Sequence, residues 1–127
     1  MRLKYEMTQV TYQDPFANNY FDCVVMINVL DHVFDASLCM DKVISITKPG
    51  GILLIGQDLS NKADIKNYDD KYGSDGIGHP IKIGHEWLEK FLSQRFENIL
   101  HKILPRELGR DPDVHYGTFI FAGKKIP

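Results

Sequence analysis

Two apolar runs separated by an amphipathic stretch dominate the pattern along the chain. Residues Phe21 to Asn28 (FDCVVMIN) form a nearly unbroken apolar run with three β-branched residues, which is typical of a central parallel strand covered on both faces. Ile52 to Gly56 (ILLIG) predicts a second buried strand. Asp35 can cap a helix between them, whose apolar positions recur at helical spacing from Ala36 to Thr47. The pattern predicts a right-handed βαβ unit.

The predicted helix stops at a short turn of sequence KPGG, residues 48–51. A lysine suits the negative end of a helix, a proline cannot continue it, and two glycines permit a turn. We therefore expect the second strand to begin directly after this turn.

The rest of the chain predicts a loop, a helix and two strands. Residues 58–79 are polar and contain three glycines, which indicates a surface loop. A stripe that includes Trp87 and Phe91 predicts a core-facing helix from about residue 84. Glu97 to Leu104 and His115 to Lys124 read as strands, and the connection between them favours antiparallel neighbours.

Composition narrows the classes of protein. The 127 residues suffice for one domain, and a net charge of -2 offers no basic surface for nucleic acid. No apolar run approaches the roughly 18 residues that span a bilayer, so no membrane association is expected. Cys23 and Cys39 lie in apolar segments and are expected to be small buried residues, which favours a cytoplasmic location.

The order of three motifs carries a resemblance to a known family. A PF...FD segment (Pro15 to Asp22) leads into the first apolar run, the segment LDHV (Leu30 to Val33) follows it, and the KPGG turn precedes the second run. This order and spacing resemble the class I S-adenosylmethionine-dependent methyltransferases of the methyltransferase type 11 kind, from about Tyr5 onward.

The resemblance implies an α/β fold, with part of a Rossmann-like sheet and flanking helices. The family's strand order is 3-2-1-4-5-7-6, so this chain would supply the 4-5-7-6 side, with an antiparallel last strand. We expect a single partial methyltransferase domain. Residues 1–20 would be a remnant of the third-strand region, 21–58 the βαβ unit, 59–83 a long loop, and 84–127 a helix followed by an antiparallel strand pair.

The resemblance also implies site residues at the carboxyl end of the first strand, where ligands bind in open α/β sheets. Asn28, Val29 and Leu30 would line the methionine and ribose side of the methyl donor, with Leu30 giving an apolar contact. Val10 and Thr11 stand where the family places an acidic and a small residue beside the adenine. Asp31 and His32 would lie nearer the acceptor.

Simpler roles compete with these assignments. Asn28 can be a turn residue that ends a strand, and His32 can be a surface residue, although its imidazole could accept an acceptor's proton near neutral pH. From topology alone, Gln57 and Asp58 are also expected to face the ligand side, as candidates of second rank. The histidines at positions 79, 85, 101 and 115 lack metal-ligand spacing, so no metal site is expected.

The family's glycine-rich cofactor loop has no counterpart in this sequence. Weak or no binding of S-adenosylmethionine by this chain alone is therefore expected, and we interpret the chain as a fragment of a longer product. The missing neighbour would leave the strand from Cys23 to Asn28 at a sheet edge, where two chains could pair as a homodimer.

Three functions are compatible with these features. The first is methyl transfer from S-adenosylmethionine to a small-molecule acceptor by a complete domain of which this chain, inactive alone, is part. The second is a non-catalytic, methyltransferase-like binding or oligomerisation module. The third, another doubly wound domain such as a dinucleotide enzyme, shares the βαβ unit, but the order of the motifs argues against it.

Overall fold

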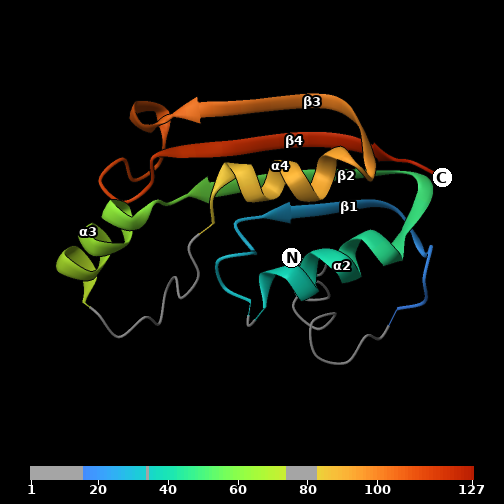
Figure 1. Cartoon of the computed structure of the whole chain (residues 1–127), viewed down its shortest axis with the longest axis horizontal. Helices are drawn as coiled ribbons and strands as arrows, with labels where there is room; N and C mark the ends of the chain where they lie inside the picture. Colours follow the sequence, from blue (N-terminus) through green and yellow to red (C-terminus); the bar gives the residue numbers. More distant parts are fainter. Residues whose placement is uncertain (1–15, 34, 74–82) are drawn as a thin grey trace.

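The computed structural model describes residues 16–33, 35–73 and 83–127 (Figure 1). Within these ranges the strands form a four-stranded sheet in the order β1-β2-β4-β3, with β1 parallel to β2, and β4 antiparallel to both of its neighbours. This arrangement confirms the α/β class, the strand order and the antiparallel last strand. The elements are β1 (Phe21–Ile27), α2 (Ala36–Ile46), β2 (Thr47–Leu59), α3 (Lys62–Tyr72), α4 (His85–Ser93), β3 (Phe96–Pro105), the 3₁₀ turn η1 (Arg106–Leu108) and β4 (Gly117–Lys125).

Helix α2 begins at its predicted cap but ends one residue early. The Asp35 carboxylate accepts a hydrogen bond from the Leu38 amide at 3.0 Å. At the other end, the backbone of Thr47 is already extended, and its hydroxyl donates a hydrogen bond to the Val43 carbonyl. The last turn contains no basic residue. Lys125 of β4 supplies the cation instead and donates to the Ile44 and Thr47 carbonyls. Partial burial lowers the pKa of the Lys125 amine.

The KPGG segment lies within β2, which corrects the expectation of a turn before the strand. Phe21 pairs with Thr47 but Cys23 pairs with Ile52, so the segment bulges out of an otherwise regular parallel register. Gly50 has a φ of 79°, which favours glycine. A Cβ at Gly51 would lie 2.8 Å from the Lys48 carbonyl oxygen. The two glycines therefore let the chain leave α2 and join the sheet without a separate loop.

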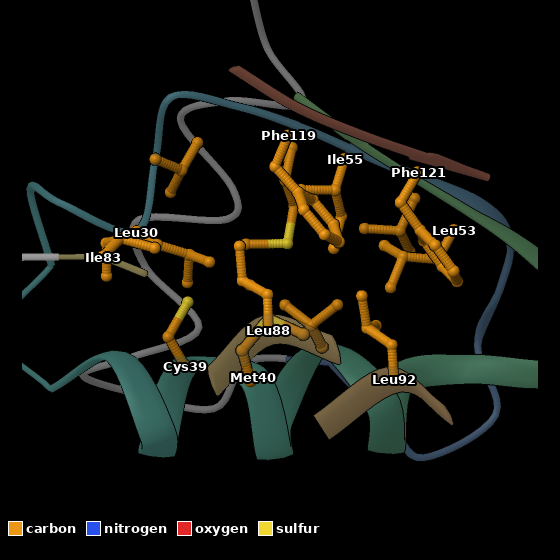
Figure 2. Packing of buried hydrophobic residues seen from close by; sticks show 14 of the residues in the cluster. Leu30, Cys39, Met40, Leu53, Ile55, Ile83, Leu88, Leu92, Phe119 and Phe121 are labelled. Atoms are coloured by element: carbon orange, nitrogen blue, oxygen red, sulfur yellow. The ribbon is translucent and has the colours of Figure 1, made fainter. Parts of the chain in front are cut away.

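The hydrophobic core lies between one face of the sheet and the two helices α2 and α4 (Figure 1, Figure 2). Alternate strand residues point into it because successive strand side chains project to opposite faces. Helix α4 has the apolar stripe that the sequence predicted, with Leu88 and Leu92 buried. The residues labelled in Figure 2 include Met40 from α2, Leu88 and Leu92 from α4, and Leu53, Ile55, Phe119 and Phe121 from the sheet.

The opposite face of the sheet is uncovered in the described part of the chain. Val24 and Met26 of β1 are buried, but Ile27 is 55% exposed and Cys23 is also exposed. The prediction that this strand is covered on both faces was therefore wrong, as was the prediction that Cys23 is buried. The reason is that both α2 and α4 pack on the same side of the sheet, and β1 is an edge strand among the described strands.

Helix α3, with 11 residues, replaces part of the loop that was predicted for residues 59–83. The sequence prediction failed here because α3 has a polar surface with little apolar periodicity. Local interactions stabilise it instead. The side chains of Asn61 and Asp64 each accept a hydrogen bond from the other's backbone amide, which forms a capping box. Lys66 and Asp70 form an ion pair one turn apart.

No helix in the described ranges is both long enough and apolar enough to cross a bilayer. The two C-terminal strands confirm the predicted antiparallel pair within two residues at each end.

Replacement of Gly51 by alanine should destabilise the fold. The added methyl would meet backbone oxygens of Lys48 and Asp22 at 2.8 and 3.1 Å, so we expect a loss of about 1–3 kcal/mol in the free energy of unfolding, measured with urea. Gly56→Ala, in the same strand, is the matched control. Its methyl would meet only the flexible end of Ile27 at 3.2 Å, and equal losses for the two variants would contradict the tight packing at Gly51.

Candidate functional site

The loop that follows β1 lies at the carboxyl ends of the two parallel strands, where open α/β sheets bind ligands. It begins at Asn28, whose φ of 51° is in the left-handed region that asparagine tolerates better than most residues. The end of β2 holds this residue from both sides: Asn28 donates its amide to the Gly56 carbonyl, and its side-chain oxygen accepts the Asp58 amide, each at 2.7 Å. Asn28 is therefore a strand-ending turn residue, and it is half-buried at the ligand end.

Gln57 fixes the next part of the loop. Its side chain is buried, and its amide oxygen accepts a hydrogen bond from the Leu30 amide at 3.2 Å. Its amide nitrogen donates to the Asp58 carbonyl at 3.1 Å. Gln57 was a candidate from topology, and the structure assigns it a positioning role, because it joins the loop after β1 to the end of β2.

The side chains of Val29 and Leu30 belong to the hydrophobic core. Val29 is 5% exposed and Leu30 is fully buried. The apolar contact that Leu30 was expected to make with the donor is therefore not available from its side chain in this structure, because the side chain points into the core layer. Val10 and Thr11, the other predicted donor contacts, lie outside the described residues.

Asp31 and His32 lie beside one another in this loop, and their place on the acceptor side stays a prediction. Asp31 is buried, whereas the His32 side chain is 47% exposed, and Asp31 Oδ1 lies 3.7 Å from His32 Nε2. A backbone hydrogen bond from His32 to Val29 closes the turn that carries them. The loop thus presents an imidazole to the surface above a buried carboxylate.

A second polar cluster stands at the end of β2, and the sequence identified only one of its members as a candidate. Asp58 is 7% exposed, and its Oδ2 lies 3.5 Å from Arg110 and 3.7 Å from His115 Nε2. The other carboxylate oxygen, Asp58 Oδ1, accepts a hydrogen bond from the Thr118 hydroxyl at 3.3 Å. His115 Nδ1 lies 3.0 Å from the Ser60 hydroxyl. Local spacing carries no signal for this cluster, because its members come from segments more than 50 residues apart.

Polar contacts attach α3 to the segment between β3 and β4. The buried carboxylate of Asp64 pairs with Arg106 at 2.7 Å, and Asn67 donates to the Asp113 carbonyl. The Tyr72 hydroxyl donates to Asp111 at 2.7 Å and, together with Lys71, lowers the pKa of the Asp111 carboxyl. Figure 1 shows α3 at the same end of the sheet as the loop after β1. Tyr72 therefore contributes to this docking, and its hydroxyl is engaged.

Other reactive groups offer little chemistry. Burial raises the pKa of the Cys39 thiol to about 11, which keeps it protonated near neutral pH. Among the residues that the structure describes, no group of three or more histidine, cysteine, aspartate or glutamate side chains is placed to hold a metal ion.

Residues 2–55 match a family model described as a methyltransferase domain. This span includes β1, α2 and the loop from Asn28 to His32. No curated protein matches the chain.

Solved structures show the same fold at low sequence identity. A protein from Galdieria sulphuraria that is described as a proposed sarcosine dimethylglycine methyltransferase superposes with a TM-score of 0.68 at 10% identity. The match covers 94% of this chain and 57% of its own. A SAM-dependent methyltransferase from Methanosarcina mazei superposes with a TM-score of 0.60 at 19% identity, over 88% of this chain and 62% of its own. The N-methyltransferase NodS from Bradyrhizobium japonicum, in complex with S-adenosylhomocysteine, superposes with a TM-score of 0.55 at 17% identity. The match covers 84% of this chain and 47% of its own.

The family match and the fold together support a class I methyltransferase, which confirms the resemblance carried by the sequence motifs. The chain spans less than two thirds of the length of each of these three structures.

Replacement of Gln57 by alanine should loosen the loop after β1. The buried Leu30 amide would lose its acceptor, so we expect a loss of about 1–3 kcal/mol in unfolding free energy and faster hydrogen exchange at Leu30 than in the wild type. Gln94→Ala, at an exposed position after α4, is the control. Unchanged exchange at Leu30 in the Gln57 variant would show that another group holds the loop.

Proposed function

We propose that this chain is part of a methyltransferase domain that moves a methyl group from S-adenosylmethionine to a small molecule. The observation that carries the proposal is the loop from Asn28 to His32. It lies at the carboxyl ends of two parallel strands, inside the segment that matches the family, and is held there by β2. Catalysis belongs to the complete domain, and the isolated chain is inactive.

The residues present fit one side of a methyl donor. Asn28 is half-buried at the ligand end, and the backbone of Val29 and Leu30 follows it in a fixed conformation. The sequence has no glycine-rich loop to approach the donor from the other side. This partial fit explains why we expect the chain alone to bind the donor weakly or not at all.

Positioning can account for much of the catalysis. Methyl transfer needs a nucleophile in line with the sulfonium methyl carbon, and a fixed geometry lowers the barrier without a covalent intermediate. We assign Asp31 and His32 to the acceptor side, where the exposed imidazole can contact the acceptor and accept its proton.

Calorimetric titration with S-adenosylhomocysteine tests the donor site. For this chain alone we expect no binding tighter than about 1 mM. A complete domain that joins this chain to a glycine-rich donor loop should bind in the micromolar range and lose at least about tenfold in affinity on Asn28→Ala. Equal affinity of that domain and its Asn28 variant would contradict a donor site at this loop.

An assembly module is the second candidate function, and the uncovered face of the sheet favours it. Val25 and Ile27 of β1 lie on this face beside Leu54 of β2, and large exposed apolar surfaces on a soluble domain commonly mark interaction sites. Among the described strands, β1 is also an edge strand, and it ends at Ile27. Under this proposal, two chains pair along β1 as a homodimer.

Light scattering tests the homodimer. We expect a dimer for the wild type and a monomer for Ile27→Lys, because the added charge would lie in the paired edge. Leu108→Lys, at an exposed apolar residue of η1, should remain a dimer. A monomeric wild type whose amides from Val24 to Ile27 exchange without protection would rule out pairing along this strand.

A further inference from the structure

A cavity of about 400 Å³ lies at the start of helix α4, and its wall combines aromatic rings with a carboxylate. The lining residues are Gly84, His85, Glu86, Trp87 and Tyr116. We propose that this cavity binds an organic ammonium ion. That the bound ion is also the methyl acceptor rests on the proposed methyl transfer, whereas the binding itself does not.

Tyr116 forms a part of the wall that is fixed in place. Its backbone amide donates to the Leu59 carbonyl at 2.9 Å, and its hydroxyl accepts a hydrogen bond from the His85 amide at 3.0 Å. His85 Nδ1 also lies 2.8 Å from this hydroxyl, and the two rings meet edge to face with their centroids 5.9 Å apart. Because Tyr116 is held at both ends, its ring loses little further freedom when a ligand binds.

Trp87 supplies a second, larger ring. Part of this ring packs against the hydrophobic core and against Phe91, whose ring centroid lies 4.9 Å away. The side chain is only half-buried, and the rest of it lines the cavity. The faces of tryptophan and tyrosine rings carry partial negative charge, and they attract a cation that lies within about 6 Å of the ring centroid.

The charged groups around the cavity also favour a cation. Glu86 forms no ion pair with any described residue, Lys90 one helical turn away included. No described lysine or arginine lines the cavity. The first amides of α4 carry partial positive charge, which the Glu86 carboxylate in the first turn more than offsets. The wall therefore places an unpaired negative charge beside two aromatic rings, which suits an organic ammonium ion.

The cavity lies at the same end of the sheet as the donor loop. The Ser60 amide, just after β2, donates to the Ile83 carbonyl at 3.0 Å, immediately before α4 begins. Within β2, the Asp58 amide donates to the Asn28 side chain at 2.7 Å. Figure 1 shows that α4 begins at the end of the sheet where β1 and β2 end. A cation in this cavity is therefore held against the strand end that also fixes the donor loop.

Trp87 is the single tryptophan of the chain and gives a direct readout. Tetramethylammonium chloride is added to the full chain at about pH 8, where an imidazole is ordinarily neutral. It should shift the Trp87 indole ¹H–¹⁵N signal and the Glu86 amide signal, and the shifts should saturate at millimolar concentrations. tert-Butanol, a neutral molecule of similar shape, and sodium chloride should give no saturable shift at the same concentrations.

Two pairs of variants separate the charge from the ring. Glu86→Gln should raise the half-saturating concentration of tetramethylammonium at least about threefold, as for a contact between exposed charges. Glu97→Gln, at an exposed carboxylate of β3 outside the cavity, should leave it unchanged. Tyr116→Leu should weaken binding at least about threefold, whereas Tyr116→Phe, which keeps the ring, should stay within about twofold. If Tyr116→Leu does not fold, the exposed Glu86 position still decides the outcome.

The absence of saturable shifts with tetramethylammonium, an equal response to tert-butanol, or a Glu86 variant that binds like the wild type would overturn the proposal. Saturation by sodium acetate in place of tetramethylammonium would also overturn it, because the cavity would then take an anion at the helix end. Failure of the proposed methyl transfer gives a different result: a complete domain that does not bind S-adenosylhomocysteine would leave the ammonium site intact.

Discussion

The parallel pairing of β1 with β2 is the constraint on which the rest of this structure depends. It places the ends of both strands at one edge of the sheet, where Asn28 and Asp58 are tied by a 2.7 Å hydrogen bond. The same pairing requires a crossover, which α2 provides, and α2 then covers the face of the sheet that α4 also covers. The candidate site is thus a consequence of a single βαβ unit, and the core is one-sided because α4 packs on the same face as α2.

One-sided burial explains several features that seem unrelated. Strand residues alternate between the core and the uncovered face, so β1 contains both fully buried Val24 and largely exposed Ile27. Parallel sheets are ordinarily covered on both faces. The face that no described residue covers can therefore pack against further polypeptide. The two proposed functions differ in whether this polypeptide is the remainder of a methyltransferase domain or a second copy of the chain.

Much of the fold could be predicted from the sequence because strong local signals mark its elements. The Asp35 cap and the apolar runs predicted the βαβ unit, and two strand-like segments near the end of the chain predicted β3 and β4. Helix α3 was missed because capping and ion pairs stabilise it rather than an apolar face. The exposure of Cys23 was missed because an apolar run shows that residues are suited to burial, and does not show whether a neighbouring element covers them.

The site was less predictable for a different reason. The loop from Asn28 to His32 was found because it is continuous and follows a recognisable strand. The Asp58, Ser60 and His115 cluster is assembled only by the pairing of β2 with β4, and no local pattern records it. Burial of Leu30 likewise follows from the packing of the loop against the core.

The central claim is that the loop after β1 faces the methyl donor. Chemical-shift mapping of this chain with S-adenosylhomocysteine at concentrations above about 1 mM, where even weak binding is populated, tests it most directly. The account predicts small shifts at the amides of Asn28, Val29, Leu30 and His32 that do not saturate. Saturable shifts confined to another surface would contradict it.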